Sequence, residues 1–361
     1  MPRLLALFII GITPGFLWAG WHSQPIDTGG GVSVFSFSTD AEEHPDIGWY
    51  RDGIIKHLEY RDEKSVSVIV ASNTWLRDGD LKLTIGKGGQ PGIVYCDENA
   101  KHLVYAQREN IAWIKTIIEH KKKGYSLPPC AFLSVVGHSP DISEIAFKDE
   151  NTGTLKYAKS VKKKWTTSNI DTGGQMTFPA ITATHDGKPL VAYYDVTKKH
   201  LKFARFIGTK WSTSTVDSGD IGKSIAVGFA DGHIPKICYF SVTEELPLKF
   251  AHWGGKGWRN LLPKCVTLAK EGTWEKSSLD LPETAIIGGT VALDKRGTPH
   301  IAYLSQSGDI IYARETPSGW ETQTIGHTDV NSIPQMMLNS EDLPRILFAG
   351  KTGLEYLYFS R

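Results

Sequence analysis

The chain has 361 residues, with 40 basic and 39 acidic side chains and a formal net charge of +1 at pH 7. This balance gives no reason to expect nucleic acid or an anionic membrane surface as a partner. Eleven Trp, 13 Tyr and 14 Phe against four Met indicate aromatic-rich β structure, and 36 Gly with 18 Pro fit many tight turns.

The N-terminus has the pattern of a secretory signal. Arg3 gives a short basic start, and the apolar stretch from Leu4 to Leu17 is interrupted by glycine and proline and is short for a membrane span. Ala19 is a small residue at a plausible cleavage point. We expect residues 1–19 to be a removed signal peptide, which leaves a secreted or periplasmic protein without a membrane span. An uncleaved anchor or an apolar first strand is the alternative.

A unit of four short strands recurs along the chain, most clearly between Trp165 and Trp211. Runs rich in Val, Ile, Thr, Tyr and Phe alternate with turns such as Asp-Gly-Lys-Pro, which is the chemistry of strands and hairpins. One aromatic position recurs seven times, as Trp49, Tyr95, Phe147, Tyr193, Tyr239, Tyr303 and Phe348. A Leu-x-aromatic pair also recurs seven times, as Leu58/Tyr60, Leu103/Tyr105, Leu155/Tyr157, Leu201/Phe203, Leu248/Phe250, Ile310/Tyr312 and Leu357/Phe359.

Seven units over about 340 mature residues give a period of about 49, which is typical of a β-propeller. One four-stranded sheet cannot cover its own apolar faces, whereas radial stacking against two neighbours does so. The chain begins with an outer-type strand, Trp21 to Asp27, and ends with a Leu-x-aromatic strand. We therefore predict an all-β fold, a single seven-bladed β-propeller over residues 20–361. Its blades have four strands, and the N-terminal strand completes the last blade and closes the ring.

The repeat is disturbed near residues 260–273. Trp258 has the correct spacing from the strand before it, and Trp274 has the correct spacing to the proline after it. An insertion of about 260–273 between them explains both spacings. Other departures are the Val-rich run Val66 to Val70 where a Trp is expected, and the Lys121 to Lys123 loop. Departures from a repeat are where binding loops are usually added to a scaffold.

The repeats resemble a family of secreted bacterial propeller proteins that is loosely grouped with the sialidase-like, BNR-repeat superfamily. The segments that carry the resemblance are PLVAYYD (Pro189 to Asp195), LKFA (Leu201 to Ala204) and PHIAYL (Pro299 to Leu304). The resemblance covers nearly the whole mature chain and implies the fold. It does not imply one activity, because that superfamily contains hydrolases, lyases and lectins.

Enzyme motifs are incomplete. The turns ending in Trp211 and Trp320 keep the glycine and Trp of an Asp box but lack its Asp, so sialidase activity is not supported. No carboxylate pair is singled out for glycoside hydrolysis. Arg61, Arg205 and Arg314 follow equivalent strands toward the outer part of the blades, and His185, His233 and His300 lie opposite the expected binding face. We expect surface or packing roles for these histidines.

The four cysteines allow two local disulfides in an exported protein, Cys96 with Cys130 and Cys238 with Cys265. Four buried free thiols are the alternative. No Cys/His spacing suggests zinc, and the loop from Asp149 to Gly153 lacks the order of a calcium loop. We predict no metal and no cofactor.

Two sets of acidic residues end strands on the face where propellers usually bind ligands. A carboxylate can accept hydrogen bonds from sugar hydroxyls, and a neighbouring aromatic ring can stack on a pyranose. The candidate ligand-binding residues are Asp97, Asp149, Asp171, Asp195, Tyr194 and Asp217. The alternative is that each carboxylate bonds to its own turn.

The sequence favours a secreted, non-catalytic binding module, with carbohydrate or an extracellular protein as ligand. A polysaccharide-degrading enzyme, either a glycoside hydrolase or a lyase, is one alternative, and a scaffold for protein assembly is another. An enzyme should show one asymmetric cluster of titratable groups. A lectin should show near-equivalent pockets of an aromatic ring and an Asp on several blades, and a scaffold should show an exposed apolar patch. We expect a monomer.

Overall fold

The computed structural model describes residues 20–360 apart from 27–28, 41, 62–63, 78–79, 86–88, 121–122, 140–141, 231–233, 244–259, 269–273, 279–285 and 331. Within these residues the regular secondary structure is entirely β, with 28 strands and no helix. In the same residues, no helix is therefore available to cross a membrane. The predicted signal peptide, residues 1–19, lies outside the described part.

The strands pair antiparallel in seven four-stranded sheets. The first three sheets are β2 (Val34–Thr39), β3 (Pro45–Arg51), β4 (Ile54–Arg61) and β5 (Lys64–Ala71); β6 (Leu81–Ile85), β7 (Pro91–Asp97), β8 (His102–Glu109) and β9 (Ala112–Glu119); and β10 (Ala131–Ser139), β11 (Ile142–Lys148), β12 (Leu155–Val161) and β13 (Lys164–Asp171). The next three are β14 (Met176–Ala183), β15 (Pro189–Asp195), β16 (His200–Ile207) and β17 (Lys210–Ser218); β18 (Ile221–Ala230), β19 (Ile234–Thr243), β20 (Asn260–Leu268) and β21 (Trp274–Ser278); and β22 (Ile286–Leu293), β23 (Pro299–Ser305), β24 (Asp309–Thr316) and β25 (Gly319–His327). The seventh sheet is β26 (Gln335–Leu338), β27 (Pro344–Ala349), β28 (Leu354–Ser360) and β1 (Gly20–Ile26).

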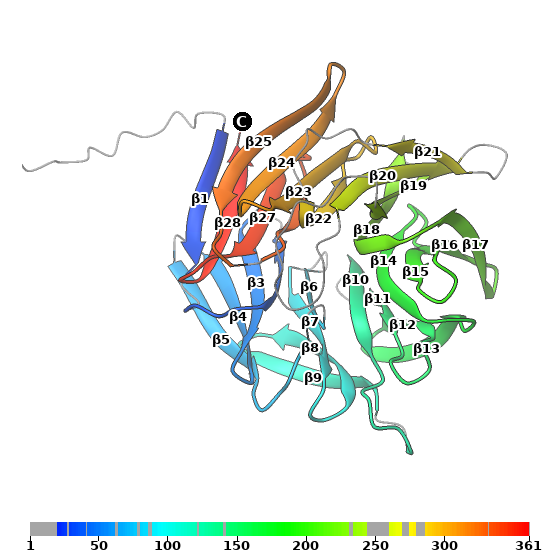
Figure 1. Cartoon of the computed structure of the whole chain (residues 1–361). Coiled ribbons are helices and arrows are strands. Elements are labelled where there is room, and N and C mark those ends of the chain that lie inside the picture. The colour runs from blue at the N-terminus through cyan, green and yellow to red at the C-terminus, as the bar shows by residue number, and fades with distance from the viewer. Residues whose placement is uncertain are drawn as a thin grey trace, which may run out of the picture.

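One end strand of each sheet lies innermost, and these innermost strands contact one another in a closed cycle. The cycle runs from β2 through β6, β10, β14, β18, β22 and β26, and returns to β2. Figure 1 shows the sheets arranged around a common centre. Each sheet combines three strands of one sequence unit with the opening strand of the next unit, and the seventh sheet takes the opening strand of the first unit.

The ends of the chain close the ring. β1 pairs antiparallel with β28, with Gly20 opposite Ser360 and Ile26 opposite Leu354. In Figure 1 the dark blue β1 lies beside the red β28. The N-terminal strand therefore supplies the outer strand of the seventh sheet, which is the closure predicted from the two ends of the sequence.

Apolar side chains hold neighbouring sheets together. The described residues form seven buried apolar clusters, and each joins two consecutive sheets. The aromatic residue that recurs in all seven units is at most 3 % exposed in every sheet. Its burial between sheets, and not ligand contact, explains its recurrence, because each sheet needs a neighbour to cover its apolar face.

Strand pairing corrects the sequence alignment of the Leu-x-aromatic pair in two sheets. Trp49 lies opposite Lys56, so Ile55 and His57 occupy the positions that Leu201 and Phe203 occupy in the fourth sheet. The predicted pair Leu58/Tyr60 is wrong by three residues. Leu357/Phe359 is wrong in the same way, since Leu354 and Tyr356 hold the equivalent places. Both segments carry apolar residues at alternative spacings, so the motif alone could not fix the register.

The fifth sheet differs from the sequence expectation. Residues 260–268, assigned to the insertion of about 260–273, form the third strand β20, and Trp274 begins the outer strand β21. The segment alternates apolar and polar residues well enough to pair as a strand. Cys238 is disulfide-bonded, and Cys265 is its register partner across the β19–β20 pair. The pair expected at Leu248/Phe250, and Trp258, lie outside the described residues.

A disulfide joins Cys96 to Cys130, as one of the two sequence alternatives predicted. Cys96 lies in β7 of the second sheet, and Cys130 directly precedes β10 of the third. Both side chains are completely buried, and no described cysteine is free. The bond therefore ties two consecutive sheets together in addition to their apolar contact.

Candidate functional site

The grooves between consecutive sheets carry different polar side chains at equivalent positions. In each sheet the residue three places before the recurring aromatic of the second strand pairs with a residue of the third strand, and the residue two places before that partner lies on the same face. We call these three places the groove positions. They are His300, Tyr312 and Arg314 in the sixth sheet, Asp46, His57 and Glu59 in the first, and Glu144, Tyr157 and Lys159 in the third. Variable side chains at fixed places on a constant scaffold can give the grooves different binding properties.

An outer-strand Trp packs over several of these grooves. Trp21 meets the Tyr312 ring edge-on at 5.0 Å between centroids. Trp113 meets the imidazole ring of His57 in the same arrangement, also at 5.0 Å. The same contact recurs for Trp165 on Tyr105 and for Trp211 on Tyr157. The recurring Trp of the sequence is therefore a wall of the groove, formed by the next sheet along the chain.

The groove between the sixth and seventh sheets opens into a cavity of about 910 Å³. Its aromatic lining is Trp21, Tyr312 and Phe359. The connections from β22 to β23 and from β26 to β27 form its rim, through residues 294–298 and 341–344. Because neighbouring strands are antiparallel, these connections lie at the opposite end of the sheets from the turns that hold Asp97, Asp149 and Asp195.

Polar groups in the cavity are held in fixed orientations. Arg314 donates from Nε and Nη2 to one carboxylate oxygen of Glu321, at 3.1 and 2.9 Å, and both side chains are about half exposed. The Trp21 indole donates to Oε1 of Gln323 at 3.1 Å. Nδ1 of His300 lies 2.6 Å from the Tyr312 hydroxyl. Burial lowers the pKa of His300 below its ordinary value, so its ring is neutral at pH 7.

The cavity lining is more acidic than basic. It contains five acidic side chains, Asp294, Glu315, Glu321, Glu341 and Asp342, and three basic ones, Lys295, Arg296 and Arg314. A site with an excess of negative charge repels polyanions and tolerates neutral ligands. An aromatic wall beside exposed donors and acceptors is suited to a ligand with an apolar face and several hydroxyl groups.

The predicted residues that end the second strands have internal partners. Asp97, Asp149 and Asp195 are at most 8 % exposed. In each, Oδ1 accepts a hydrogen bond from the backbone N–H two residues later, at 2.9, 3.1 and 3.1 Å respectively. These bonds hold the turn into the third strand, which is the structural alternative that the sequence left open.

The predicted residues that end the outer strands connect neighbouring sheets. The Tyr193 hydroxyl donates to Oδ2 of Asp171 at 2.7 Å, and Tyr239 donates to Asp217 in the same way one sheet further on. Tyr194 is 5 % exposed and donates to the carbonyl of Gly219 at 3.0 Å. None of the six predicted residues lines the cavity between the sixth and seventh sheets. A ligand-binding role for them stays a prediction.

Replacing Asp171 with Asn should lower the free energy of unfolding by roughly 1–3 kcal/mol at pH 7, since a charge-assisted bond between sheets is lost. Burial raises the pKa of Asp171, but bonds from Lys202, Tyr193 and the Gly173 N–H outweigh burial and lower it below 3.8. The contribution of the charge is therefore fully present above the ordinary pKa and disappears as pH falls through the lowered one.

Urea unfolding of wild type and Asp171→Asn between pH 7 and pH 3 measures this difference. The difference in the free energy of unfolding between the two proteins should become smaller as the pH falls. Asp186→Asn is the matched control, because Asp186 bonds only locally, to Thr184 and Lys188, at an exposed turn. A difference for Asp171→Asn that stays constant across the pH range would contradict the account.

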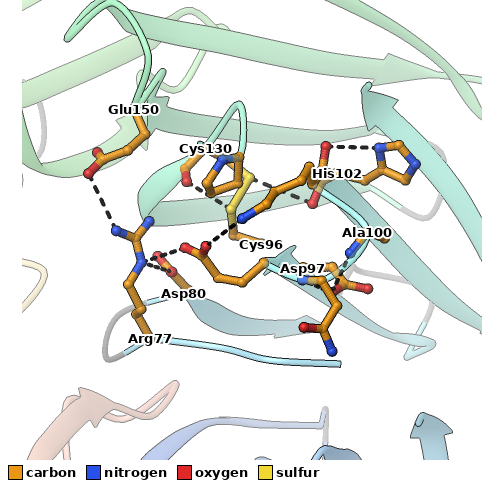
Figure 2. A network of polar contacts seen from close by, with 12 residues as sticks. Arg77, Asp80, Cys96, Asp97, Ala100, His102, Cys130 and Glu150 are labelled. Carbon is orange, nitrogen blue, oxygen red and sulfur yellow. Dashed lines mark hydrogen bonds and ion pairs between the residues drawn. A yellow bond between two sulfur atoms is a disulfide. The ribbon is translucent and has the colours of Figure 1, made fainter. Parts of the chain in front are cut away.

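One asymmetric ionic cluster lies beside the Cys96–Cys130 disulfide. Nε of Arg77 lies 2.6 Å from Glu98 Oε1 and 3.3 Å from Asp80 Oδ2, and its Nη1 donates to Glu150 at 3.4 Å. Figure 2 shows Arg77 between Asp80 and Glu150, which come from different sheet connections. Burial raises the pKa of Asp80 to about 7, against the opposing effect of Arg77. The cluster lines neither the cavity between the sixth and seventh sheets nor a smaller one of about 200 Å³ beside Ser307 and His327.

The outer strands of the first two sheets carry exposed apolar side chains. Val66 and Ile69 on β5 are 56 % and 60 % exposed, and Ile114 on β9 is 47 % exposed. The Val-rich run that replaces the outer-strand Trp is thus partly on the surface, whereas Val70 at its end is buried. This is the feature that a protein-assembly scaffold would show.

Comparison with known proteins supports the fold. The chain matches no protein-family model and no curated protein. Among solved structures, it is similar to AofleA from Arthrobotrys oligospora, with 13 % identity, coverage of 84 % of this chain and 90 % of that chain, and a TM-score of 0.54. It is also similar to the polysaccharide lyase Uly1, with 10 % identity, coverage of 98 % and 93 %, and a TM-score of 0.52.

A third similar structure is the fucose-recognising lectin of Aleuria aurantia, described as a six-bladed β-propeller. It shows 12 % identity, coverage of 82 % of this chain and 97 % of that chain, and a TM-score of 0.48. At these identities the likenesses to AofleA and Uly1 show the fold alone.

Proposed function

We propose that the protein is a non-catalytic binding module for neutral carbohydrate, with the ligand bound in the cavity between the sixth and seventh sheets. The observation that carries the proposal is the combination of an aromatic wall with exposed, oriented polar groups in one cavity. Trp21 and Tyr312 provide apolar ring surface, and Arg314 and Glu321 provide donors and acceptors. Pockets that bind small ligands commonly have this composition, mostly apolar with a few placed polar groups.

The charge of the cavity lining indicates whether the ligand is a neutral or an acidic saccharide. A polysaccharide lyase eliminates across a uronate, so its substrate carries a carboxylate on the reacting sugar. The cavity has more acidic than basic groups, and His300 is neutral at pH 7. These features support a neutral saccharide over a polyuronate. The Cys96–Cys130 disulfide supports a secreted or periplasmic location, since such bonds persist in oxidising compartments.

A glycan array with the mature protein tests the proposal. We expect binding to glycans that end in neutral sugars and none to uronate or sulfated glycans at the same density. Binding confined to anionic glycans would contradict it, and so would the absence of binding to any glycan. Raising the salt concentration should leave the affinity nearly unchanged, because a neutral ligand gains little from long-range charge attraction.

A polysaccharide-degrading enzyme is the second candidate, and the ionic cluster around Arg77 is the observation that favours it. Asp80 has a pKa near 7, which suits a general acid or base, but it is only 1 % exposed. Release of reducing ends or of unsaturated products from a polysaccharide panel, lost in Asp80→Asn, would support the enzyme. We favour the binding module because the cluster lines neither described cavity.

A further inference from the structure

The groove between the first and second sheets holds a buried cluster of one imidazole and two carboxylates. The groove positions of the first sheet are Asp46 on β3 and His57 and Glu59 on β4. Donor atoms from all three lie within 4.8 Å of one another. Asp46 and Glu59 are 7 % and 6 % exposed, and His57 is completely buried beneath the ring of Trp113.

The imidazole in this cluster lacks a hydrogen bond. Neither ring nitrogen of His57 has a hydrogen-bond partner among the described residues, and the same holds for Oδ1 of Asp46. These two groups are nevertheless close, since Oδ1 of Asp46 lies 2.8 Å from Nε2 of His57. A short separation without hydrogen-bond geometry means that the oxygen lies off the direction of the ring N–H. Fully buried polar atoms left in this state are uncommon and require an explanation.

The guanidinium of Arg108 contacts Glu59 beside the cluster. A cation bound between the two carboxylates that takes a lone pair from His57 gives the unpaired nitrogen a partner.

The donor set indicates the type of cation. One imidazole nitrogen with two carboxylate oxygens is typical of zinc and similar divalent transition ions, whereas calcium prefers six to eight oxygens. Zinc lies about 2.0–2.2 Å from nitrogen and oxygen ligands, so two donors on one ion are at most about 4.4 Å apart. One donor atom from each of the three residues lies within 4.8 Å of the other two. A movement of less than about 1 Å therefore brings all three donors within this limit.

We propose that Asp46, His57 and Glu59 form a divalent transition-metal site that fastens the first sheet beneath Trp113 of the second. The site is separate from the carbohydrate cavity, which uses the same groove positions two grooves away in the ring. One fold position thus holds a metal in one groove and a sugar in another. The metal adds a cross-link between β3 and β4 on the sheet face that the second sheet covers.

Zinc uptake by the chelator-treated protein tests the site. After gel filtration with excess zinc removed, we expect one zinc per chain in wild type, measured by mass spectrometry of the metal. Zinc should also raise the melting temperature, because an ion bound only to the folded state stabilises it. His57→Gln and Asp46→Asn should each lose the bound zinc and the thermal shift, with an affinity loss of at least about 100-fold.

The matched control is His327→Gln. His327 lies between Asp309 and Asp329, at 3.0 and 3.4 Å, but it is half exposed. It therefore tests whether any histidine beside two carboxylates retains zinc, and the stoichiometry should not change in this variant. Calcium in place of zinc should give no thermal shift.

Three results would overturn the proposal: no zinc retained by wild type, equal retention in His57→Gln, or loss in His327→Gln alone. If His57→Gln fails to fold, cobalt(II) binding to wild type and to Asp46→Asn provides a second test. Cobalt-loaded wild type should show the visible absorption of a nitrogen- and oxygen-ligated ion, and Asp46→Asn should not. A wild-type spectrum equal to that of free cobalt would also overturn the proposal.

Discussion

Removing residues 20–26 should unfold the protein or lower its free energy of unfolding by about 5 kcal/mol or more. β1 is the outer strand of the seventh sheet, and its loss exposes the edge of β28. Trp21 and Ile26 also leave apolar clusters that join the seventh sheet to its two neighbours. Loss of a packed Trp alone costs about 3–5 kcal/mol in a protein core. Because the total free energy of unfolding of a domain is about 5–15 kcal/mol, a loss of this size removes a large part of it.

A circular permutant separates loss of the strand from loss of chain continuity. Gly20 lies opposite Ser360, so a short turn placed after residue 361 can lead into residues 20–26 as a hairpin. The permutant starts at residue 29 and contains every strand. We expect its melting temperature to lie within a few degrees of wild type, whereas the deletion loses the cooperative transition. A deletion variant that melts like wild type would show that β1 does not close the ring.

Replacing Arg314 with Met should weaken binding of a neutral saccharide by roughly 10- to 150-fold. Hydrogen bonds to charged groups contribute about 1.5–3 kcal/mol each, and Arg314 presents several donors to the cavity. Stability should change by less than about 1 kcal/mol, because its pair with Glu321 is at the surface. Titration calorimetry with a glycan bound on the array, together with urea unfolding, measures both quantities.

Arg205→Met is the matched control for this substitution. Arg205 pairs with Leu190 as Arg314 pairs with His300, so the two arginines are at the same groove position in different sheets. Arg205 does not line the cavity. Its replacement should leave binding unchanged. Equal loss of affinity in both variants would mean that the binding site is elsewhere.

The fold could be predicted because every blade repeats the same packing requirement. The recurring aromatics, from Trp49 to Phe348, are buried in all seven sheets, and such burial leaves a pattern that spacing alone can find. Closure by the N-terminal strand followed from the missing outer strand at the C-terminal end. The register of the third strand in the first and seventh sheets could not be predicted from the sequence, because the apolar residues there fit more than one spacing.

The candidate sites could not be predicted, because strand pairing brings their residues together from separate segments. Asp46 meets Glu59 only through the β3–β4 register, and the two residues show no metal-binding spacing in the sequence. His300 was assigned to packing or surface, yet it lines the cavity, whose other wall comes from β1 at the opposite end of the chain. The predicted aspartates hold turns and connect sheets, which accounts for their recurrence, and a ligand-binding role for them stays a prediction.

The position of a bound saccharide in the crystal tests the central claim most directly. Crystals of the mature protein soaked with the best neutral glycan from the array should show the sugar between the sixth and seventh sheets. We expect one sugar face on the ring of Trp21 or Tyr312, and a hydroxyl within hydrogen-bond distance of Arg314 or Glu321. Sugar density at the turns that hold Asp97, Asp149 and Asp195, with this cavity empty, would contradict the account.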